Sequence, residues 1–392
     1  MAENTQQDPF GKLPEELRIK IIKLSPNPFA LRNLAHASPA MGRVLDRYAL
    51  EIVEEVMEAT VPVQTRRLMD AVLKARFSDF FASMPEAQTI AEADWVFATE
   101  NIHSSGRDQA AAAVRSLLAS AANVHAWSHA CLEHLIRKSM QLRPSTLIKL
   151  GRGPGRTHQE EFENAESQKD YIPQETGPPS WVEEQRMMKS FWRLQFLLEL
   201  QGAGHEGRLD AIWPRQEIDA LSQSSADDFY DIMGYEQEMI FTARDFLDAV
   251  TSGSVTSVES DHHNAYSLPT IRWVEGAVSR CFCAEPLYFE MNKDIFDQGA
   301  DKINSTFAYR FWCAMTSKDD WLYGMFLRLW YPFQTWRKYG FAIWDDKRMV
   351  DLGMRNPRRS HFGANSISYS FRWWSMLTEE EKSQPTLQYR HR

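Results

Sequence analysis

The stretch from Phe10 to Tyr48 reads FGKLPEELRIKIIKLSPNPFALRNLAHASPAMGRVLDRY, and it decides how the rest of the chain is interpreted. Pro14 stands just before two acidic residues, and Pro39 directly follows Ser38; both arrangements are typical of helix starts. Between them, the segment 25–28 should stop the first helix, because its two prolines lack a backbone N–H and restrict the residues before them. The pattern predicts three short helices joined by very little chain, the third reaching about residue 59.

Apolar side chains recur at helical spacing along all three predicted helices. The stripe of the first helix consists of Leu13, Leu17, Ile21 and Leu24, that of the second of Phe29, Leu31 and Leu34, and that of the third of Met41, Val44, Leu45, Tyr48, Ile52 and Val56. A unit of about forty residues is too small to bury all of this surface internally. We therefore expect the remainder to face the rest of the chain or a partner protein.

The same stretch resembles an F-box, and specifically the F-box-like segment common at the N-terminus of fungal proteins. In place of the tryptophan that often closes the motif, this chain has Val44, Leu45 and Tyr48. The resemblance covers roughly a tenth of the chain. The residues that carry it are Leu13-Pro14-Glu15-Glu16-Leu17, Ile21-Ile22, Leu24, the proline-containing turn, Leu31, Leu34 and Ala37-Ser38.

The resemblance implies a substrate-receptor subunit of a ubiquitin ligase of the Skp–cullin–F-box type. Its N-terminal helices would bind a Skp-family adaptor, and through it a cullin, while the remaining chain would bind a protein substrate. Such a receptor performs no bond chemistry and acts by raising the effective concentration of its target. The residues implied to contact the adaptor are Leu13, Pro14, Leu17, Ile21, Leu24, Leu31 and Leu34.

Two other interpretations stay open. The chain could be a non-catalytic interaction protein whose F-box-like unit is a vestige packed against its own domain. It could also be an enzyme with an active site assembled from distant helical residues, in a deep pocket with convergent ionisable groups. Burial separates the first alternative from the F-box interpretation, because a stripe covered by residues beyond 60 would not be available to an adaptor.

Composition narrows the class of protein. The chain has 392 residues, of which 43% are hydrophobic, and a net charge of −9 with a sequence pI of about 5.7. This charge argues against a nucleic-acid-binding protein, which usually carries a basic patch. The sequence has no apolar run of about eighteen residues and no secretory signal, so we expect no membrane segment and a cytoplasmic or nuclear location. Four irregularly spaced cysteines do not form a disulfide framework.

The fold class predicted is mostly α: an F-box-like unit over residues 8–59, followed by a large irregular multi-helical domain over 60–392. Residues 180 and 183 form a capping box, Ser-x-x-Glu, at the start of a central helix that is apolar nearly all round. Polar segments at 151–179 and 251–266 are expected to be mobile loops. Helices are predicted at about 65–81, 107–121, 123–140, 181–202 and 227–250, with shorter pieces at 268–283, 305–316, 319–330 and 345–352.

Three short motifs could carry chemistry, but each favours a simpler interpretation. The glycine-rich segment 151–155 lacks the Gly-Lys-Ser/Thr ending of a phosphate loop and reads as a flexible loop. Cys281-x-Cys283 has no second pair to complete a zinc site, so buried thiols are favoured. Asp261-His262-His263 lies in a serine-rich loop without a further ligand. We expect no metal, cofactor or catalytic residue.

The C-terminal part is rich in tryptophan. Seven of the thirteen tryptophans lie between Trp312 and Trp374. Large aromatic side chains favour a packed core here, and a binding face is the alternative. The stretch Trp344–Met349 is similar to a Trp-Asp segment found in fungal F-box proteins. The basic run at 355–359 is interpreted as a solvated loop, and the sequon at Asn304 as a chance match.

Overall fold

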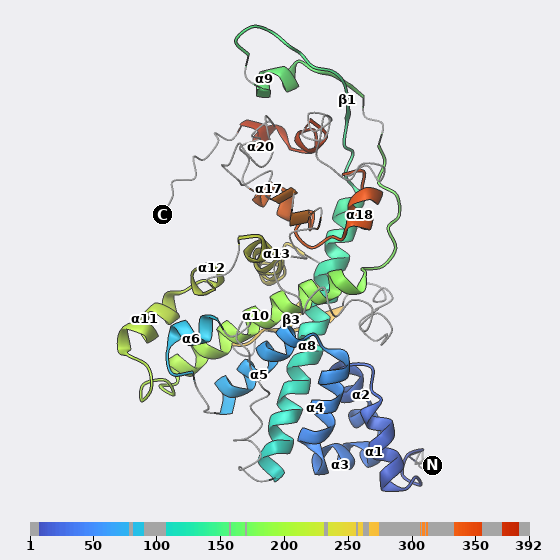
Figure 1. The fold of residues 1–392 in the computed structure, drawn as a ribbon, viewed down its shortest axis with the longest axis vertical. Coiled ribbons are helices and arrows are strands. Elements are labelled where there is room, and N and C mark those ends of the chain that lie inside the picture. The colour runs from blue at the N-terminus through green and yellow to red at the C-terminus, as the bar shows by residue number, and fades with distance from the viewer. Residues whose placement is uncertain are drawn as a thin grey trace. The chain divides into compact units, whose positions relative to one another are not determined.

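The computed structural model describes residues 8–77, 81–89, 107–156, 158–168, 171–230, 234–255, 258–261, 266–273, 306, 308–309, 311–312, 333–354 and 371–383. The described chain is mostly helical, which confirms the predicted mostly-α class (Figure 1). Among its helices, none combines the length and the apolar composition that crossing a membrane requires.

The chain divides into two compact units. The first comprises Met1–Cys131, Pro179–Met233 and Ala243–Gln298, and the second comprises Leu132–Pro178, Gly234–Thr242 and Gly299–Arg392. The first unit holds residues from both sides of the boundary expected after residue 59, and that boundary stays a prediction.

The first unit contains the N-terminal helices and the central helix. Its elements are α1 (Glu15–Lys23), α2 (Pro28–Ala37), α3 (Pro39–Arg47), α4 (Ala49–Thr60), α5 (Val63–Phe77), α6 (Met84–Gln88), most of α8 (Arg107–Met140), α10 (Trp181–His205), α11 (Arg215–Gln223), α12 (Ala226–Phe229), the end of α13 (Gly234–Thr251), β3 (Val258–Asp261) and β4 (Thr270–Trp273).

Local signals place the starts of α2 and α3. The Asn27 side chain accepts a hydrogen bond from the Ala30 N–H at 2.7 Å, and Pro28 occupies the first turn of α2. The Ser38 hydroxyl oxygen accepts from the Met41 N–H at 3.1 Å, as the Ser-Pro pair predicts. The helix expected to reach residue 59 is instead two helices, because Tyr48, at φ −125° and ψ 35°, leaves the helical conformation between α3 and α4.

Helix α8 is one helix of 34 residues, and the prediction of two helices separated near Asn123 is wrong. Asn123 does not cap a helix start. Its side-chain amide donates to the carbonyl oxygens of Leu268 and Pro269, at 2.9 and 3.1 Å. The indole N–H of Trp127, one turn further, donates to the same Pro269 oxygen at 2.7 Å. Asparagine is a residue type common at helix ends, and tertiary hydrogen bonds explain why this one stands in the middle of a helix.

The capping box at the start of α10 is confirmed. The Ser180 N–H donates to Glu183 Oε2 at 2.9 Å, and the Glu183 N–H donates to Ser180 Oγ at 3.4 Å. The helix extends to His205, three residues beyond the expected end. Helix α5 packs along it, and Arg76 of α5 forms an ion pair with Glu199 of α10. Together α5, α8 and α10 form the centre of the first unit (Figure 1).

Two polar segments expected as loops contain regular structure. Strand β1 (Thr146–Lys149) pairs with β2 (Glu166–Gln168) in antiparallel register, with α9 (His158–Glu163) between them. Strand β3 pairs antiparallel with β4, so residues 270–273 are a strand and not the start of a helix. The expected helix at 227–250 is also divided: α12 ends at Phe229 and α13 begins at Gly234.

The second unit has an aromatic core. Its elements are the end of α8, β1, α9, β2, the start of α13, α17 (Gln334–Arg337), α18 (Asp346–Asp351) and α20 (Glu379–Ser383). The Phe311 ring contacts the rings of Trp336, Phe341 and Trp373, at centroid distances of 5.8, 5.5 and 4.5 Å. These four side chains are buried, as the core interpretation predicts. The predicted helix at 319–330 lies outside the described residues.

Candidate functional site

Helix α1 buries little of its own surface. It packs against α3 and α4, and among its residues Ile22 alone is buried. Leu17 on this helix is 46% exposed, and Leu24 at its C-terminal end is 80% exposed. Both are among the few large apolar side chains that stand exposed in the described parts of the chain. We call Leu17 and Leu24, with the exposed Pro14, the α1 patch.

The other predicted adaptor contacts are distributed around this patch. Leu13, Ile21 and Leu34 are half-buried, whereas Leu31 is fully buried. Leu31 therefore helps to hold α2 in place and offers no surface to a partner. The sequence stripe missed Ile22 as the buried anchor of α1. Ile21 and Ile22 are adjacent, and helical spacing alone does not decide which of them faces inward.

Polar contacts fix the orientation of α1. At its start, Glu15 accepts from Arg47 Nη1 at 3.0 Å and from the Tyr48 hydroxyl at 2.7 Å. At its end, Lys23 forms ion pairs with Glu51 and Glu55 of α4, at 2.7 and 2.5 Å. Hydrogen bonds to these two carboxylates raise the pKa of Lys23 above its ordinary value. Each exposed pair is weak, but the two ends together hold the α1 patch in one orientation.

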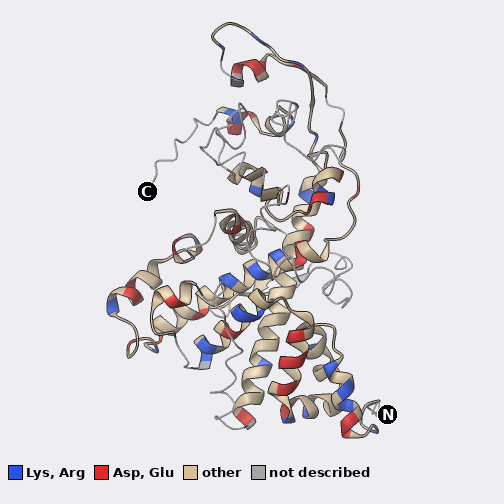
Figure 2. Cartoon of the chain, viewed as in Figure 1, with Lys and Arg blue, Asp and Glu red and all other residues tan. Residues whose placement is uncertain are grey.

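A further anchor comes from the residue that precedes the motif. The Asp8 carboxylate accepts from the Ala40 N–H at 2.8 Å and from the Ser38 hydroxyl at 2.9 Å. The hydrogen bond from the Ala40 N–H is the main cause that lowers the pKa of Asp8. Asp8 thus caps α3 together with Ser38. Beside α1, the outward face of α4 is acidic (Figure 2), with exposed Glu51, Glu54, Glu55 and Glu58.

Two histidines lie on the face of α8 that looks toward α2 and α10. The His125 ring stacks on Phe29 with centroids 4.6 Å apart, and it contacts the His129 ring at 4.4 Å. Burial lowers the pKa of His125 to about 4, and burial together with the neighbouring His125 lowers that of His129 to about 3. Glu184 Oε1 lies 3.7 Å from His129 Nε2, which is too long for a hydrogen bond. Both rings are therefore neutral at pH 7.

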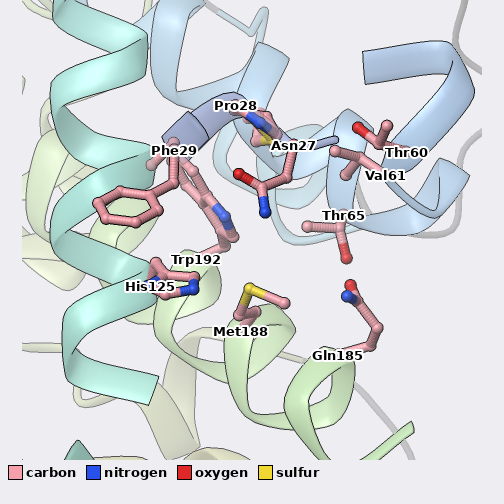
Figure 3. Close-up of a pocket in the computed structure, with 12 residues that line it drawn as sticks. Asn27, Pro28, Phe29, Thr60, Val61, Thr65, His125, Gln185, Met188 and Trp192 are labelled. Atoms are coloured by element: carbon pink, nitrogen blue, oxygen red, sulfur yellow. The ribbon is translucent and has the colours of Figure 1, made fainter. Parts of the chain in front are cut away.

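A pocket of about 420 Å³, measured to its open mouth, lies beside this pair (Figure 3). Its wall includes the first residues of α2, the end of α4, and side chains from α5, α8 and α10. Every residue that lines it belongs to the first unit. No local sequence motif marks this pocket, because its walls come from five separate helices.

The remaining motifs add no site to the described residues. Gly151–Gly155 is irregular chain, with Gly155 at φ +76°. Cys131 is buried, and burial raises the pKa of its thiol. In the described part of the chain, no group of three His, Cys, Asp or Glu side chains could hold a metal ion. The other motifs lie outside the described residues: Cys281, Cys283, Cys313, His262, His263, Asn304 and the run 355–359.

Comparison of the chain with known proteins found no matching family model, no matching curated protein and no matching solved structure.

Proposed function

We propose that this chain is a substrate receptor of a Skp–cullin–F-box type ubiquitin ligase, and that it binds the Skp-family adaptor through the α1 patch. The observation that carries the proposal is the exposure of Leu17 and Leu24 on a helix held in place at both ends. Coverage of the apolar stripe by residues beyond 60 would exclude adaptor binding. These two leucines are not covered by the described residues of the chain.

The structure of α1 suggests how the contact would work. Burying one exposed leucine in an interface contributes about 1.5–3 kcal/mol. Leu17 and Leu24, with Pro14 and the half-buried Leu13, would supply the apolar centre of the contact, and Ile21 and Leu34 its edge. Leu31 would act indirectly, because it is buried and positions α2. Interfaces of this kind depend on a few central apolar residues.

The receptor role assigns no bond chemistry to the chain. A bound target would be held near the charged conjugating enzyme, and transfer would follow from effective concentration. We place target binding in residues 60–392, without assigning it to particular side chains. The alternative, a protein-interaction protein with a vestigial F-box-like unit and no ligase role, predicts an α1 patch that binds no adaptor.

The first experiment measures adaptor binding. The double variant Leu17→Glu/Leu24→Glu changes only exposed side chains, so the fold should survive. The matched control is Ile148→Glu/Ile172→Glu, which changes two isoleucines of the second unit that are 57% and 70% exposed. In co-purification with a Skp-family adaptor, we expect the α1 variant to lose binding by at least about 30-fold per leucine and the control to bind normally. Equal binding by both variants would overturn the assignment.

A second experiment separates a ligase subunit from a protein that merely binds the adaptor. The chain, the adaptor, a cullin–RING complex and a charged conjugating enzyme are combined without any target. A receptor held in such a complex has its own lysines at high effective concentration, so self-ubiquitination is expected. The Leu13→Ala/Pro14→Ala variant should abolish this modification. Adaptor binding without any modification of the chain would favour the interaction-protein alternative.

A further inference from the structure

The pocket beside His125 is lined partly by α2 and α4 and by no residue of the α1 patch. Its apolar wall includes Phe29, Val61, Met69, Met188 and Trp192. The pocket is open to solvent at its mouth, so a small molecule can reach these side chains. We propose that this pocket binds a small uncharged molecule with a flat apolar body and one polar group that accepts a hydrogen bond from Thr65.

The charge of the wall sets the charge of the ligand. No Asp, Glu, Lys or Arg lines the pocket. The one titratable side chain in the wall is His125, and burial lowers its pKa to about 4, so it is neutral at pH 7. A charged ligand would lose its hydration without gaining an opposite charge. The wall therefore selects against anions and cations of the same shape.

Thr65, in the first turn of α5, supplies the polar contact. Its side chain is 3% exposed, and its hydroxyl has no hydrogen-bond partner among the described residues. A buried hydroxyl without a partner is unfavourable, and most buried polar groups in proteins are paired. In Figure 3 the Thr65 hydroxyl and the Gln185 amide lie at the same end of the pocket. An acceptor placed there would satisfy the hydroxyl.

The shape of the ligand follows from the side chains at the other end. His125 and Phe29 are stacked nearly parallel, with an interplanar angle of 8°, and Trp192 lies beside them in Figure 3. Aromatic walls of this kind favour flat rings. Met69 and Met188 have flexible thioether chains, which adapt to the ring edge and make favourable sulfur–aromatic contacts. A small flat aromatic compound meets these requirements.

Occupancy would have a structural effect. The pocket takes walls from α2 and α4 and also from α5, α8 and α10, so a ligand would contact both groups of helices at once. A molecule that binds only the folded state at free concentration c raises the apparent stability by RT ln(1 + c/Kd), which grows with the logarithm of that concentration. The ligand would therefore strengthen the attachment of the N-terminal helices to α8 and α10.

The test uses three probes of one shape on the full chain: 2-naphthol, naphthalene and the anion 2-naphthoate. Isothermal titration should show 2-naphthol binding at least about tenfold more tightly than 2-naphthoate. The variant Thr65→Val keeps the side-chain shape and removes the hydroxyl. It should weaken 2-naphthol binding by about tenfold and leave naphthalene binding unchanged.

A second variant checks that the probes bind in this pocket. Ala121 lies in the wall on α8, and Ala121→Met should fill space and weaken both neutral probes, with circular dichroism confirming the fold. Absence of 2-naphthol binding up to its solubility limit would overturn the proposal, as would equal affinity for the naphthoate. Equal affinity of the Thr65→Val protein for 2-naphthol would also overturn it. None of these outcomes depends on adaptor binding, which is measured with the Leu17 and Leu24 variants.

Discussion

Helices α1 and α10 differ in opposite ways from the rule that apolar side chains are buried and polar ones exposed. Helix α1 exposes Leu17 and Leu24 and buries Ile22 alone. Helix α10 buries eighteen of its 25 residues, and these include charged side chains such as Glu183, Arg186 and Lys189. A helix interior to the fold can bury charges when they are partnered, whereas a helix at the edge exposes leucines when nothing in its own chain covers them.

Hydrogen bonds explain how α10 accommodates its polar residues. Lys189 donates to Gln64 Oε1 of α5, and Gln195 donates to Glu199 at 2.6 Å. Arg76 of α5 donates to the same Glu199 carboxylate. With the described residues, the side chains of helix α1 form their ion pairs and hydrogen bonds at its two ends, through Glu15 and Lys23. We therefore expect α10 to govern stability and α1 to govern binding.

The largest expected effect concerns the apolar side of α10. Phe191 is fully buried and packs against Trp127 of α8, with ring centroids 5.8 Å apart. Phe191→Ala removes this contact and leaves a cavity, so the free energy of unfolding should fall by about 4 kcal/mol. Urea unfolding followed by circular dichroism measures the change. A loss below about 1 kcal/mol would show that α10 is not the centre of the first unit.

The next effect depends on pH. Burial, with a smaller effect of His125, lowers the pKa of His129 from 6.5 to about 3. Between these values the unfolded chain binds a proton that the folded chain does not, so stability falls as the pH falls below 6.5. At pH 4.5 this one side chain should cost about 3 kcal/mol relative to pH 7.

His129→Gln removes this titration and should flatten the acid side of the stability curve. Glu184, whose Oε1 atom lies 3.7 Å from the ring, is present in both proteins. The matched control is His36→Gln, which makes the same substitution at an exposed histidine of α2 and should leave the free energy of unfolding at pH 7 unchanged. Unfolding midpoints in urea between pH 7 and pH 4.5 measure the difference. Parallel curves for wild type and His129→Gln would contradict the burial of a neutral ring.

A smaller effect is expected for the ion pair that joins α5 to α10. Arg76 donates to Glu199 and also to the Ser116 and Ser120 hydroxyl oxygens of α8, both at 2.8 Å. Arg76→Met removes the cation that faces the largely buried Glu199 carboxylate and leaves it the hydrogen bond from Gln195, at a cost of about 2 kcal/mol. The double variant Arg76→Met/Glu199→Met should recover part of this loss. A double variant less stable than the single would contradict the explanation.

The parts of the fold that the sequence predicted are those fixed by adjacent residues. Ser38 and Ser180 each cap a helix from within one turn, and both starts are confirmed. The break at Tyr48 was missed because no proline or glycine marks it. Asn123 was misassigned because its partners, Leu268 and Pro269, lie far along the chain. Local chemistry decides helix starts, but long-range contacts decide where helices continue.

In the candidate site too, the sequence predicted what adjacent residues determine and not what long-range contacts determine. Periodicity identified the apolar residues of α1, but it did not show that Ile22 is the buried one or that Leu31 is inaccessible. Which face of a short helix is covered depends on α3 and α4, and the pattern of α1 holds no information about them. The pocket was beyond sequence reasoning for a stronger reason, since five separate helices contribute to it.

The variant with the smallest expected effect on stability is also the sharpest test of the difference between α1 and α10. Leu24 is 80% exposed at the end of α1, so Leu24→Ser removes almost no buried contact. The free energy of unfolding should change by less than about 0.5 kcal/mol, far below the loss expected for Phe191→Ala. Adaptor affinity should nevertheless fall by about tenfold or more, because the serine offers no apolar surface to the partner. Urea unfolding and co-purification with the adaptor, made on the same protein preparation, measure the two quantities.

Ile22→Ser is the matched variant on the same helix, because it places the same residue at the one buried position of α1. It should lower stability by about 2–4 kcal/mol, and any loss of adaptor binding should follow the unfolding of α1. A Leu24→Ser protein that loses as much stability as Ile22→Ser would show that the leucine is covered in solution. In that case the α1 patch would be part of the core, and the contrast between the edge helix and the central helix would not hold.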